Sequence, residues 1–374
     1  MSAADPGAEA RRETVAALLP DFPWDVLAPF GELARQHPGG AVDLSVGTPV
    51  DPTPVLIQDA LRAAADAPGY PTTAGRDDLR AACSDWIHRT LGADVAPSAV
   101  LPGIGSKEMV ASLPRLLGLP TGSRVVIPRI AYPTYAVGAI LAGCEPVATD
   151  EPESVEGARL VWLNSPGNPT GSVLSAGRAA EVVAWARDTG AIVVSDECYI
   201  ELGWDAEPVS VLHPSVSGGS HVGVLAVHSL SKRSNLAGYR FGFVAGDPVL
   251  VGDLLAVRKH VGMMVPTPVQ MAAIAALGDD EHVAAQRAVY GRRREVLRQA
   301  LLDAGFRIDH SEAGLYLWAT RGEPCWDTVR WCAESGVLVT PGDFYGPSGA
   351  EHVRVALTAT DAQVAAAAAR LTGA

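Results

Sequence analysis

The sequence predicts an α/β protein with a mainly parallel central sheet, and three observations support this fold class. Short apolar runs rich in β-branched residues alternate with helical stretches through the middle of the chain. These runs are apolar at nearly every position, as in parallel strands that are covered on both faces. Polar residues gather directly after the runs, where open α/β sheets bind their ligands. Alternation of strand and helix indicates the parallel arrangement.

The central elements follow in chain order. The segment 101–110 (LPGIGSKEMV) is expected to be a glycine turn that runs into a helix. A later helix is expected over 175–189, because Ser175 can cap its first turn and Gly190 can end it. The central strands are expected at 123–128, 159–166, 191–197 and 223–231.

The pattern changes after about Pro266. Long helices rich in alanine and arginine precede two further strands, in AGLYLWAT (313–320) and VRVALT (353–358). This shift predicts a second, smaller α+β domain. We expect an N-terminal arm at 1–40 that joins the small domain, a large domain at 41–265 and the small domain at 266–374. A low-complexity tail is expected over about 1–12.

Composition excludes several classes of function. Hydrophobic residues make up 48% of the 374 residues and charged residues 19%, which is enough for a core and argues against disorder. The net charge of −13 argues against a nucleic-acid surface. The chain shows no signal peptide and no run of ~18 apolar residues that would cross a membrane. The five cysteines are scattered without CxxC pairs, which predicts a cytoplasmic protein without disulfides or a metal site.

Lys232 is unusual because the chain has only three lysines among 29 lysine and arginine residues. It lies in HSLSKRSN, directly after a predicted strand. Arginine stays protonated, whereas a lysine amine can lose its proton and form a Schiff base with an aldehyde. The position therefore suggests a nucleophilic amine.

The glycine turn at 101–110 suggests an anion site. A helix N-terminus presents N–H groups to an anion, and Gly105, Ser106 and Lys107 would face a phosphate there. A dinucleotide site is not supported, because Glu108 stands where GxGxxG needs glycine, and no P-loop motif is present. An ordinary connection between strand and helix is the alternative interpretation.

Four more residues follow strand ends or begin a strand, and each has a purely structural alternative. Asp196 could cap a strand end, or it could keep a heterocyclic nitrogen protonated. Asn168 could belong to a turn, and Tyr199 could be a core residue. Arg240 begins an apolar strand, where an unpaired guanidinium would be costly without an anionic partner such as phosphate. With Lys232, these groups together match pyridoxal 5′-phosphate, which needs a lysine Schiff base and an acidic partner for its ring nitrogen.

From about Leu44 to the C-terminus, the same motifs in the same order resemble the class I/II, aspartate-aminotransferase-like enzymes of pyridoxal phosphate fold type I. The resemblance implies that Lys232 bonds to the cofactor aldehyde and that Asp196 pairs with the pyridine nitrogen. Tyr199 and Asn168 would hydrogen-bond the ring oxygen, and Tyr132 would stack on the ring. The remaining cofactor contacts would come from Gly105, Ser106, Lys107, Ser229 and Arg240, all near the phosphate.

The resemblance also assigns residues outside the cofactor ring. Arg354 would grip the substrate α-carboxylate, with Gly47 and Asn168 close to the substrate. Tyr70, in GYPTTAGR, would reach the phosphate of a neighbouring subunit, which implies a homodimer with shared active sites. The expected substrates are an amino acid and a 2-oxo acid, with glutamate and 2-oxoglutarate as one pair.

Three further segments resemble the actinobacterial N-succinyldiaminopimelate aminotransferases of lysine biosynthesis, namely LPDFPWD (19–25), HSEAGLYLWATR (310–321) and PGDFYGPSG (341–349). An aminotransferase for another amino acid, or a carbon–sulfur lyase on the same fold, is the nearest alternative. A transcription regulator is disfavoured because only about 40 residues precede the core motifs. A NAD-dependent oxidoreductase lacks its glycine motif. Arg35, Arg258 and Lys259 are candidate partners of a distal carboxylate, although each could be a solvated surface charge.

Overall fold

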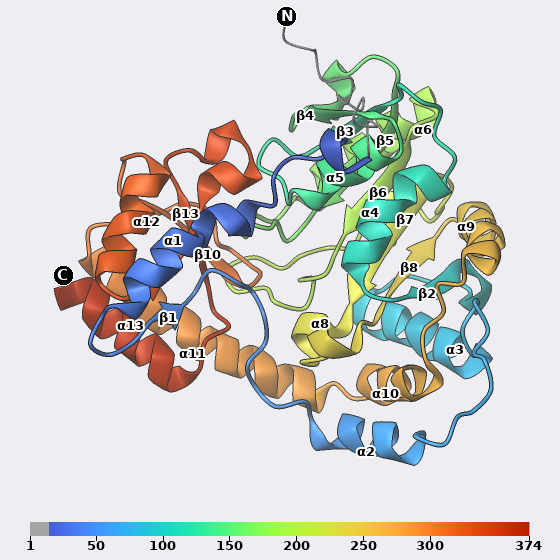
Figure 1. Cartoon of the computed structure of the whole chain (residues 1–374). Coiled ribbons are helices and arrows are strands. Elements are labelled where there is room, and N and C mark those ends of the chain that lie inside the picture. Colours follow the sequence, from blue (N-terminus) through green and yellow to red (C-terminus); the bar gives the residue numbers. More distant parts are fainter. Residues whose placement is uncertain (1–14, 374) are drawn as a thin grey trace, which may run out of the picture.

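A computed structural model describes residues 15–373 (Figure 1). Its larger sheet has seven strands, and β3 to β7 run parallel to one another. Only β8 runs antiparallel to its neighbours β7 and β2. The predicted mainly parallel α/β fold is confirmed. In spatial order the strands are β2 (Val100–Gly103), β8 (Gly242–Gly246), β7 (Val224–Ser229), β6 (Ile192–Asp196), β5 (Ala158–Asn164), β3 (Arg124–Ile127) and β4 (Glu145–Ala148).

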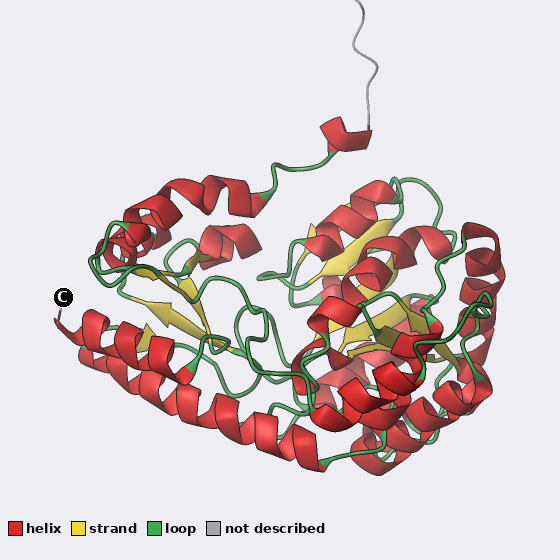
Figure 2. Ribbon diagram, turned by 60° about the horizontal axis from the view of Figure 1, so that its bottom comes forward, coloured by secondary structure: helices red, strands yellow, loops and turns green. Residues whose placement is uncertain are grey.

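Helices cover both faces of this sheet, as Figure 2 shows. On one face Val194 and Leu225 belong to an apolar cluster with residues of α4 (Ser106–Leu116), α5 (Thr134–Leu141) and α9 (Pro248–Val261). On the other face Val193 and Ala226 pack with α3 (Asp77–Trp86) and α6 (Ala176–Thr189). Two buried faces explain why these strands are apolar at nearly every position.

The helix predicted at 175–189 forms as α6 with the expected signals at both ends. The Ser175 hydroxyl accepts a hydrogen bond from the Arg178 N–H at 3.2 Å. Gly190 ends the helix with φ 74°, a left-handed conformation that glycine adopts without steric cost.

A second sheet has four antiparallel strands, in the order β12 (Thr340–Pro341), β13 (Val353–Ala356), β10 (Tyr316–Thr320) and β9 (Arg307–Ile308). The long helix α11 (Glu281–Asp303) packs against α13 (Asp361–Gly373), and α12 (Cys325–Glu334) packs against the N-terminal helix α1 (Pro23–Arg35). A parallel pair, β1 (Val42–Asp43) with β11 (Val337–Leu338), joins the N-terminal segment to this half.

The division into an arm at 1–40, a large domain at 41–265 and a small domain at 266–374 stays a prediction. Helix α10 (Thr267–Leu277) packs against α2 (Val55–Ala63) and α3, beside the larger sheet. We therefore propose that the boundary falls after Leu277. The predicted low-complexity tail at 1–12 lies outside the described residues.

The remaining helical segments are short. The one that matters for the site is α8 (Leu230–Arg233), a single turn after β7. Within residues 15–373, no helix combines the length and the apolar character that a membrane crossing requires. The other short segments are η1 (Val15–Leu18), η2 (Ile87–Leu91), η3 (Pro97–Ala99), η4 (Pro152–Ser154), α7 (Pro214–Ser217), η5 (Ala237–Tyr239), η6 (Gly342–Tyr345) and η7 (Pro347–Gly349).

Candidate active site

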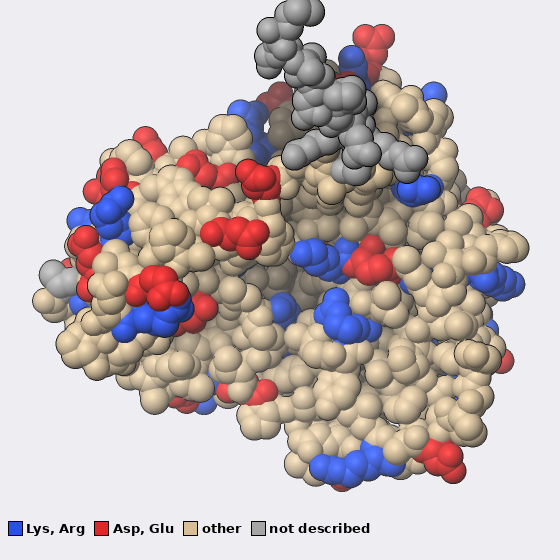
Figure 3. All heavy atoms as spheres, in the orientation of Figure 1, with Lys and Arg blue, Asp and Glu red and all other residues tan. Residues whose placement is uncertain are grey.

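A cavity of about 610 Å³ lies where the carboxyl ends of β5, β6 and β7 face the smaller sheet. This volume is within the usual range for a cofactor or small-molecule site. In Figure 3 lysine and arginine atoms gather in the hollow between the two halves of the molecule. The cavity is lined by the predicted residues Gly47, Ser106, Lys107, Tyr132, Asn168, Asp196, Tyr199, Ser229, Lys232, Arg240 and Arg354.

Lys232 projects into this cavity from α8. The Ser229 hydroxyl caps that helix by accepting a hydrogen bond from the Ser231 N–H at 3.1 Å. The Lys232 amine donates to the Gly47 carbonyl oxygen and forms no ion pair with another described residue. Burial lowers the pKa of Lys232, because an apolar environment disfavours the charged amine. The amine is thus shifted toward the neutral form that acts as a nucleophile.

Asp196 ends β6 and is only 7% exposed. The Tyr135 hydroxyl donates to its Oδ2 at 2.9 Å, and the Cys198 N–H donates to its Oδ1 at 3.2 Å. No lysine or arginine among the described residues pairs with it, and burial raises the pKa of its carboxyl. A buried carboxylate without a cation suits a protonated ring nitrogen, so this residue fits the pyridoxal phosphate ring.

Asn164 holds the loop after β5 in place, a role that the sequence interpretation did not identify. Its Nδ2 donates to the carbonyl oxygens of Asp196 (3.0 Å) and Pro166 (3.2 Å), while its Oδ1 accepts from the Asn168 N–H at 2.8 Å. The position of Asn164 at the end of an apolar strand was the available signal. Through these bonds, the Asn168 loop and the end of β6 are fixed together.

Arg354 comes from β13 and is 3% exposed. Its Nη1 donates to Asn168 Oδ1 at 2.9 Å and its Nη2 to the Ser45 carbonyl oxygen at 2.5 Å. It is the only one of the five buried arginines in residues 15–373 that lacks a carboxylate partner. The other four, Arg233, Arg258, Arg293 and Arg294, each form an ion pair. An uncompensated buried guanidinium beside a cavity calls for an anionic ligand.

Tyr316 is a site residue that the sequence interpretation missed, because it lies in a segment interpreted only as a strand of the smaller domain. Its hydroxyl lies 3.1 Å from the Tyr199 hydroxyl, and the Arg354 guanidinium lies 4.1 Å from its ring centroid. A Cβ at Gly47 would lie 2.2 Å from the Tyr316 hydroxyl oxygen. Only glycine at position 47 leaves room for the Tyr316 side chain on this side of the cavity.

The N-terminus of α4 and Arg240 form the opposite end of the cavity. Gly105 precedes the helix with φ 100°, and a Cβ there would lie 2.2 Å from Arg240 Nη2. Arg240 donates to the Ala237 carbonyl oxygen at 2.7 Å and has no carboxylate partner among the described residues. Helix N–H groups beside a guanidinium, with Ser106 in the first turn, make a site suited to phosphate.

The mouth of the cavity contains two aromatic residues from the N-terminal segment. Phe22 and Trp24 line it, and Lys107 Nζ lies 5.9 Å from the Phe22 ring centroid. Trp24 Nε1 is buried and has no hydrogen-bond partner among residues 15–373. The motif LPDFPWD was the available signal for both. Three candidates for a distal carboxylate, Arg35, Arg258 and Lys259, do not line the cavity.

Tyr70 does not line the cavity of its own chain. It lies between α2 and α3 and is 95% exposed. Its predicted contact with a neighbouring subunit stays a prediction. Gly105 also lies outside the cavity lining, although it contacts Arg240 as described above.

The sequence and the fold were compared with known proteins. The family model "Aminotransferase class I and II" matches residues 40–371. A 4-dedimethylamino-4-oxo-anhydrotetracycline transaminase of Streptomyces rimosus is 59% identical over 95% of this chain and 99% of its own. A probable aminotransferase of Mycobacterium tuberculosis is 60% identical over 98% of this chain and 88% of its own. An LL-diaminopimelate aminotransferase of Dehalococcoides mccartyi is 33% identical over 89% of this chain and 90% of its own.

Solved structures are similar over nearly the whole chain. An aminotransferase of Neisseria meningitidis has a TM-score of 0.87 and 32% identity, and covers 96% of this chain and 99% of its own. A probable N-succinyldiaminopimelate aminotransferase of Thermus thermophilus has a TM-score of 0.84 and 28% identity, with coverage of 94% and 100%.

Proposed function

Because this chain belongs to the class I and II aminotransferase family and is a pyridoxal phosphate-dependent aminotransferase, we propose that its substrate is N-succinyl-LL-2,6-diaminopimelate. The amino-group acceptor would be 2-oxoglutarate, which becomes glutamate. When bound, pyridoxal phosphate supplies an aldehyde that condenses with amines and a ring that withdraws electrons from the substrate Cα.

In this proposal Lys232 has two roles. Its Nζ would be the attachment point of the cofactor, and its neutral amine would be the base for the proton on the substrate Cα. Burial supports both roles, since it lowers the pKa of the amine. Asp196 would balance the charge of the ring nitrogen, Tyr199 and Asn168 would bind the ring oxygen, and Tyr132 would stack on the ring. The phosphate would be held by Gly105, Ser106, Lys107, Ser229 and Arg240, which surround the N-terminus of α4.

The observation that carries the proposal of an amino-acid substrate is the buried guanidinium of Arg354, which has no carboxylate partner among residues 15–373. Its planar fork matches a carboxylate in a way that a lysine amine cannot. Asn168 and the Ser45 carbonyl fix its orientation, and its side chain faces the cavity next to Gly47. An α-carboxylate held there would place the substrate amino group beside Lys232.

The mouth of the cavity supports a long acidic substrate. A succinyl-substituted amino acid extends beyond the α-carboxylate site and carries further carboxylates. Trp24 Nε1, which has no hydrogen-bond partner among residues 15–373, can donate a hydrogen bond to an amide or carboxylate oxygen there. The similarity to two enzymes named for diaminopimelate substrates points the same way.

A second candidate substrate is a ring ketone of the anhydrotetracycline type. The 59% identity to the Streptomyces rimosus transaminase favours it, and the aromatic rings of Phe22 and Trp24 at the mouth could pack against fused rings.

A substrate panel separates these candidates. Glutamate formation from 2-oxoglutarate is measured with N-succinyl-LL-2,6-diaminopimelate, unmodified LL-diaminopimelate, alanine and aspartate. The tetracycline-type ketone is tested with glutamate as donor. We expect the succinyl substrate to exceed the others in kcat/KM by at least about tenfold, which corresponds to about 1.4 kcal/mol. Turnover no faster than that of alanine or aspartate would remove the narrow assignment, and faster turnover of the ketone would establish the second candidate.

We also propose that the enzyme is a homodimer whose active sites are shared. Several exposed apolar side chains lie in the segment before α2 and in its first turn, and these are Val46, Val50, Val55 and Leu56. Tyr70 lies in the loop that follows α2. Large exposed apolar groups of this kind suit a protein–protein interface. A second copy seated there would bring Tyr70 to the phosphate end of the neighbouring cavity.

A further inference from the structure

A small cavity lies behind the carboxyl ends of β6 and β7, next to the candidate active site. Its polar lining includes Glu197, His228 and Arg233, and its apolar lining includes Trp86 and Phe243. Its volume is about 10 Å³, which is roughly the space that one buried water molecule needs.

Each of the three polar residues is the chain neighbour of a residue that lines the active site. Two of these residues stand at strand ends, Glu197 after β6 and His228 in β7, where successive side chains point to opposite faces of the sheet. Arg233 follows Lys232 in the single turn of α8. The pairs of chain neighbours are Asp196 and Glu197, Ser229 and His228, and Lys232 and Arg233, with the active-site residue first; Ser229 lines both cavities.

Polar atoms of these side chains have no hydrogen-bond partner among the described residues. They are Glu197 Oε2, both ring nitrogens of His228 and Arg233 Nη2. The three residues are 1%, 2% and 4% exposed. Glu197 Oε2 and His228 Nε2 are 3.6 Å apart, which is too long for a good direct hydrogen bond. A molecule that bridges these atoms would satisfy groups that are otherwise costly to bury.

The charges around the cavity favour a neutral occupant. Burial raises the pKa of Glu197 to about 7, and the charge of the neighbouring Asp196 also raises it. The Val211 N–H, which donates to Glu197 Oε1 at 2.8 Å, lowers this pKa but does not outweigh burial. Burial, together with the charge of Arg233, lowers the pKa of His228 to about 3. Arg233 is already paired with Glu201. Below about pH 7 the lining carries no unmatched charge, so water fits better than an ion.

We propose that one ordered water occupies this cavity and bridges Glu197, His228 and Arg233, and that these three are positioning residues for Asp196 and Lys232. The bridge would tie the ends of β6 and β7 to α8, whose single turn is too short to be rigid alone. The positioning role rests on the proposed roles of Asp196 and Lys232, whereas the water site stands independently of them.

The water is tested by a crystal structure of the cofactor-free protein. We expect one ordered water within about 3.2 Å of Glu197 Oε2 and of a ring nitrogen of His228. A dry cavity, or direct contacts among the three side chains, would overturn the proposal. Because no cofactor is present, this result does not depend on the proposed catalytic roles.

The positioning role is tested with His228→Phe, which keeps an aromatic ring but removes both nitrogens. Titration of the cofactor-free variant with pyridoxal phosphate should give a Kd raised about tenfold. The kcat should fall about tenfold, because Asp196 and Lys232 are displaced. The KM for glutamate should change less than about twofold, because Arg354, which binds the substrate carboxylate, is unchanged. Glu197→Gln retains a hydrogen-bonding side chain and should keep the Kd within about twofold of wild type.

Thr328→Val in α12 is the matched control, since it removes a buried hydroxyl that donates to Glu323, in a helix of the smaller half of the molecule. It should lower Tm without changing the cofactor Kd. If His228→Phe does not fold, Glu197→Leu provides the same comparison. A cofactor Kd and kcat that stay within about twofold of wild type in whichever of the two apolar variants folds would contradict the positioning role.

Discussion

Arg354 Nη1 donates a hydrogen bond of 2.9 Å to Asn168 Oδ1, which connects β13 of the smaller sheet to the loop that follows β5. The two residues are far apart in sequence, and they meet only because the two sheets face each other across the cavity. This hydrogen bond orients the buried guanidinium of Arg354, which has no carboxylate partner among the described residues. One consequence for substrate binding can be measured.

Replacement of Arg354 by lysine should weaken binding of every substrate that carries an α-carboxylate. The lysine keeps the charge but loses the planar fork and the bond to Asn168. We expect kcat/KM for glutamate to fall about 100-fold, which corresponds to about 2.7 kcal/mol. Steady-state kinetics with glutamate and 2-oxoglutarate provide the measurement. A KM unchanged for both would remove the proposed role.

Asp196→Asn should make the cofactor-free protein more stable at neutral and alkaline pH. Burial raises the pKa of Asp196 in the folded state, so folding stability falls as the pH rises through the unfolded pKa of about 3.9 toward the folded value. Asparagine does not ionise and avoids this loss. The Tm of the variant should exceed that of the wild type at about pH 8, and the difference should shrink near pH 4.

The same variant should bind pyridoxal phosphate more weakly, because the ring nitrogen loses its anionic partner. Opposite changes in stability and cofactor affinity would separate a functional carboxylate from a structural one. A Tm difference independent of pH would show that the buried charge is not the cause.

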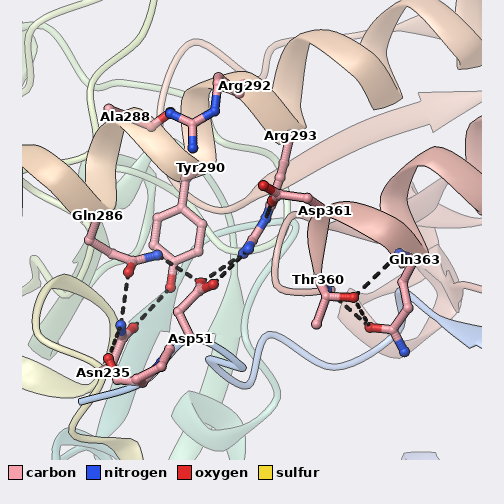
Figure 4. Close-up of polar contacts among 11 residues, drawn as sticks. Asp51, Asn235, Gln286, Ala288, Tyr290, Arg292, Arg293, Thr360, Asp361 and Gln363 are labelled. Atoms are coloured by element: carbon pink, nitrogen blue, oxygen red, sulfur yellow. Dashed lines mark hydrogen bonds and ion pairs between the residues drawn. The ribbon is translucent and has the colours of Figure 1, made fainter. Parts of the chain in front are cut away.

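A polar network around Arg293 joins α11 to the strand-end loops, as Figure 4 shows. Arg293 donates two hydrogen bonds to Asp51, at 2.6 and 2.7 Å, and one to Asp361 at 2.6 Å. Gln286 continues the network from Asp51 to Asn235, which lies three residues after Lys232.

Arg293→Ala should lower the free energy of unfolding by about 3 kcal/mol, because it leaves the partly buried Asp51 without its cation. Arg307→Ala is the control, since Arg307 forms an exposed pair with Asp309 and its loss should cost less than about 1 kcal/mol. Urea denaturation measures both. Equal losses in the two variants would show that the network contributes little.

Shared active sites predict complementation between two inactive variants. Lys232→Ala removes the attachment point, whereas Tyr70→Ala should weaken the cofactor contact that a chain gives to its neighbour. In a mixed dimer, one site carries both defects and the other carries neither. Co-expression should therefore restore activity that neither variant shows alone in the presence of limiting cofactor. The absence of any recovery in isolated mixed dimers would contradict sharing.

The sequence predicted the central sheet well because its strands are buried on both faces. The segments 123–128, 159–166, 191–197 and 223–231 correspond to β3, β5, β6 and β7. The strand β4 was missed because its sequence, EPVA, is short and half-exposed. The strand β2 was interpreted as part of a glycine turn, because Pro102 and Gly103 disfavour strand structure in isolation.

The site was predictable where a residue type is itself informative. Lys232 stands out because lysine is rare in this chain, and Asp196 because it follows an apolar strand. Tyr316 gave no such signal. Asn164 and Trp24 had one, a strand end and the motif LPDFPWD, but neither signal shows which residues they contact in the fold. Tyr316 meets Tyr199 only after the smaller sheet packs against the larger one. The position of a residue in the sequence does not by itself show such contacts.

The central claim is that Lys232 binds the cofactor covalently. Borohydride converts the C=N bond between a lysine and the cofactor aldehyde into a stable amine, and peptide mapping then locates the label. We predict a single labelled peptide that contains Lys232. A label on Lys107 or Lys259, or no label at all, would contradict the account.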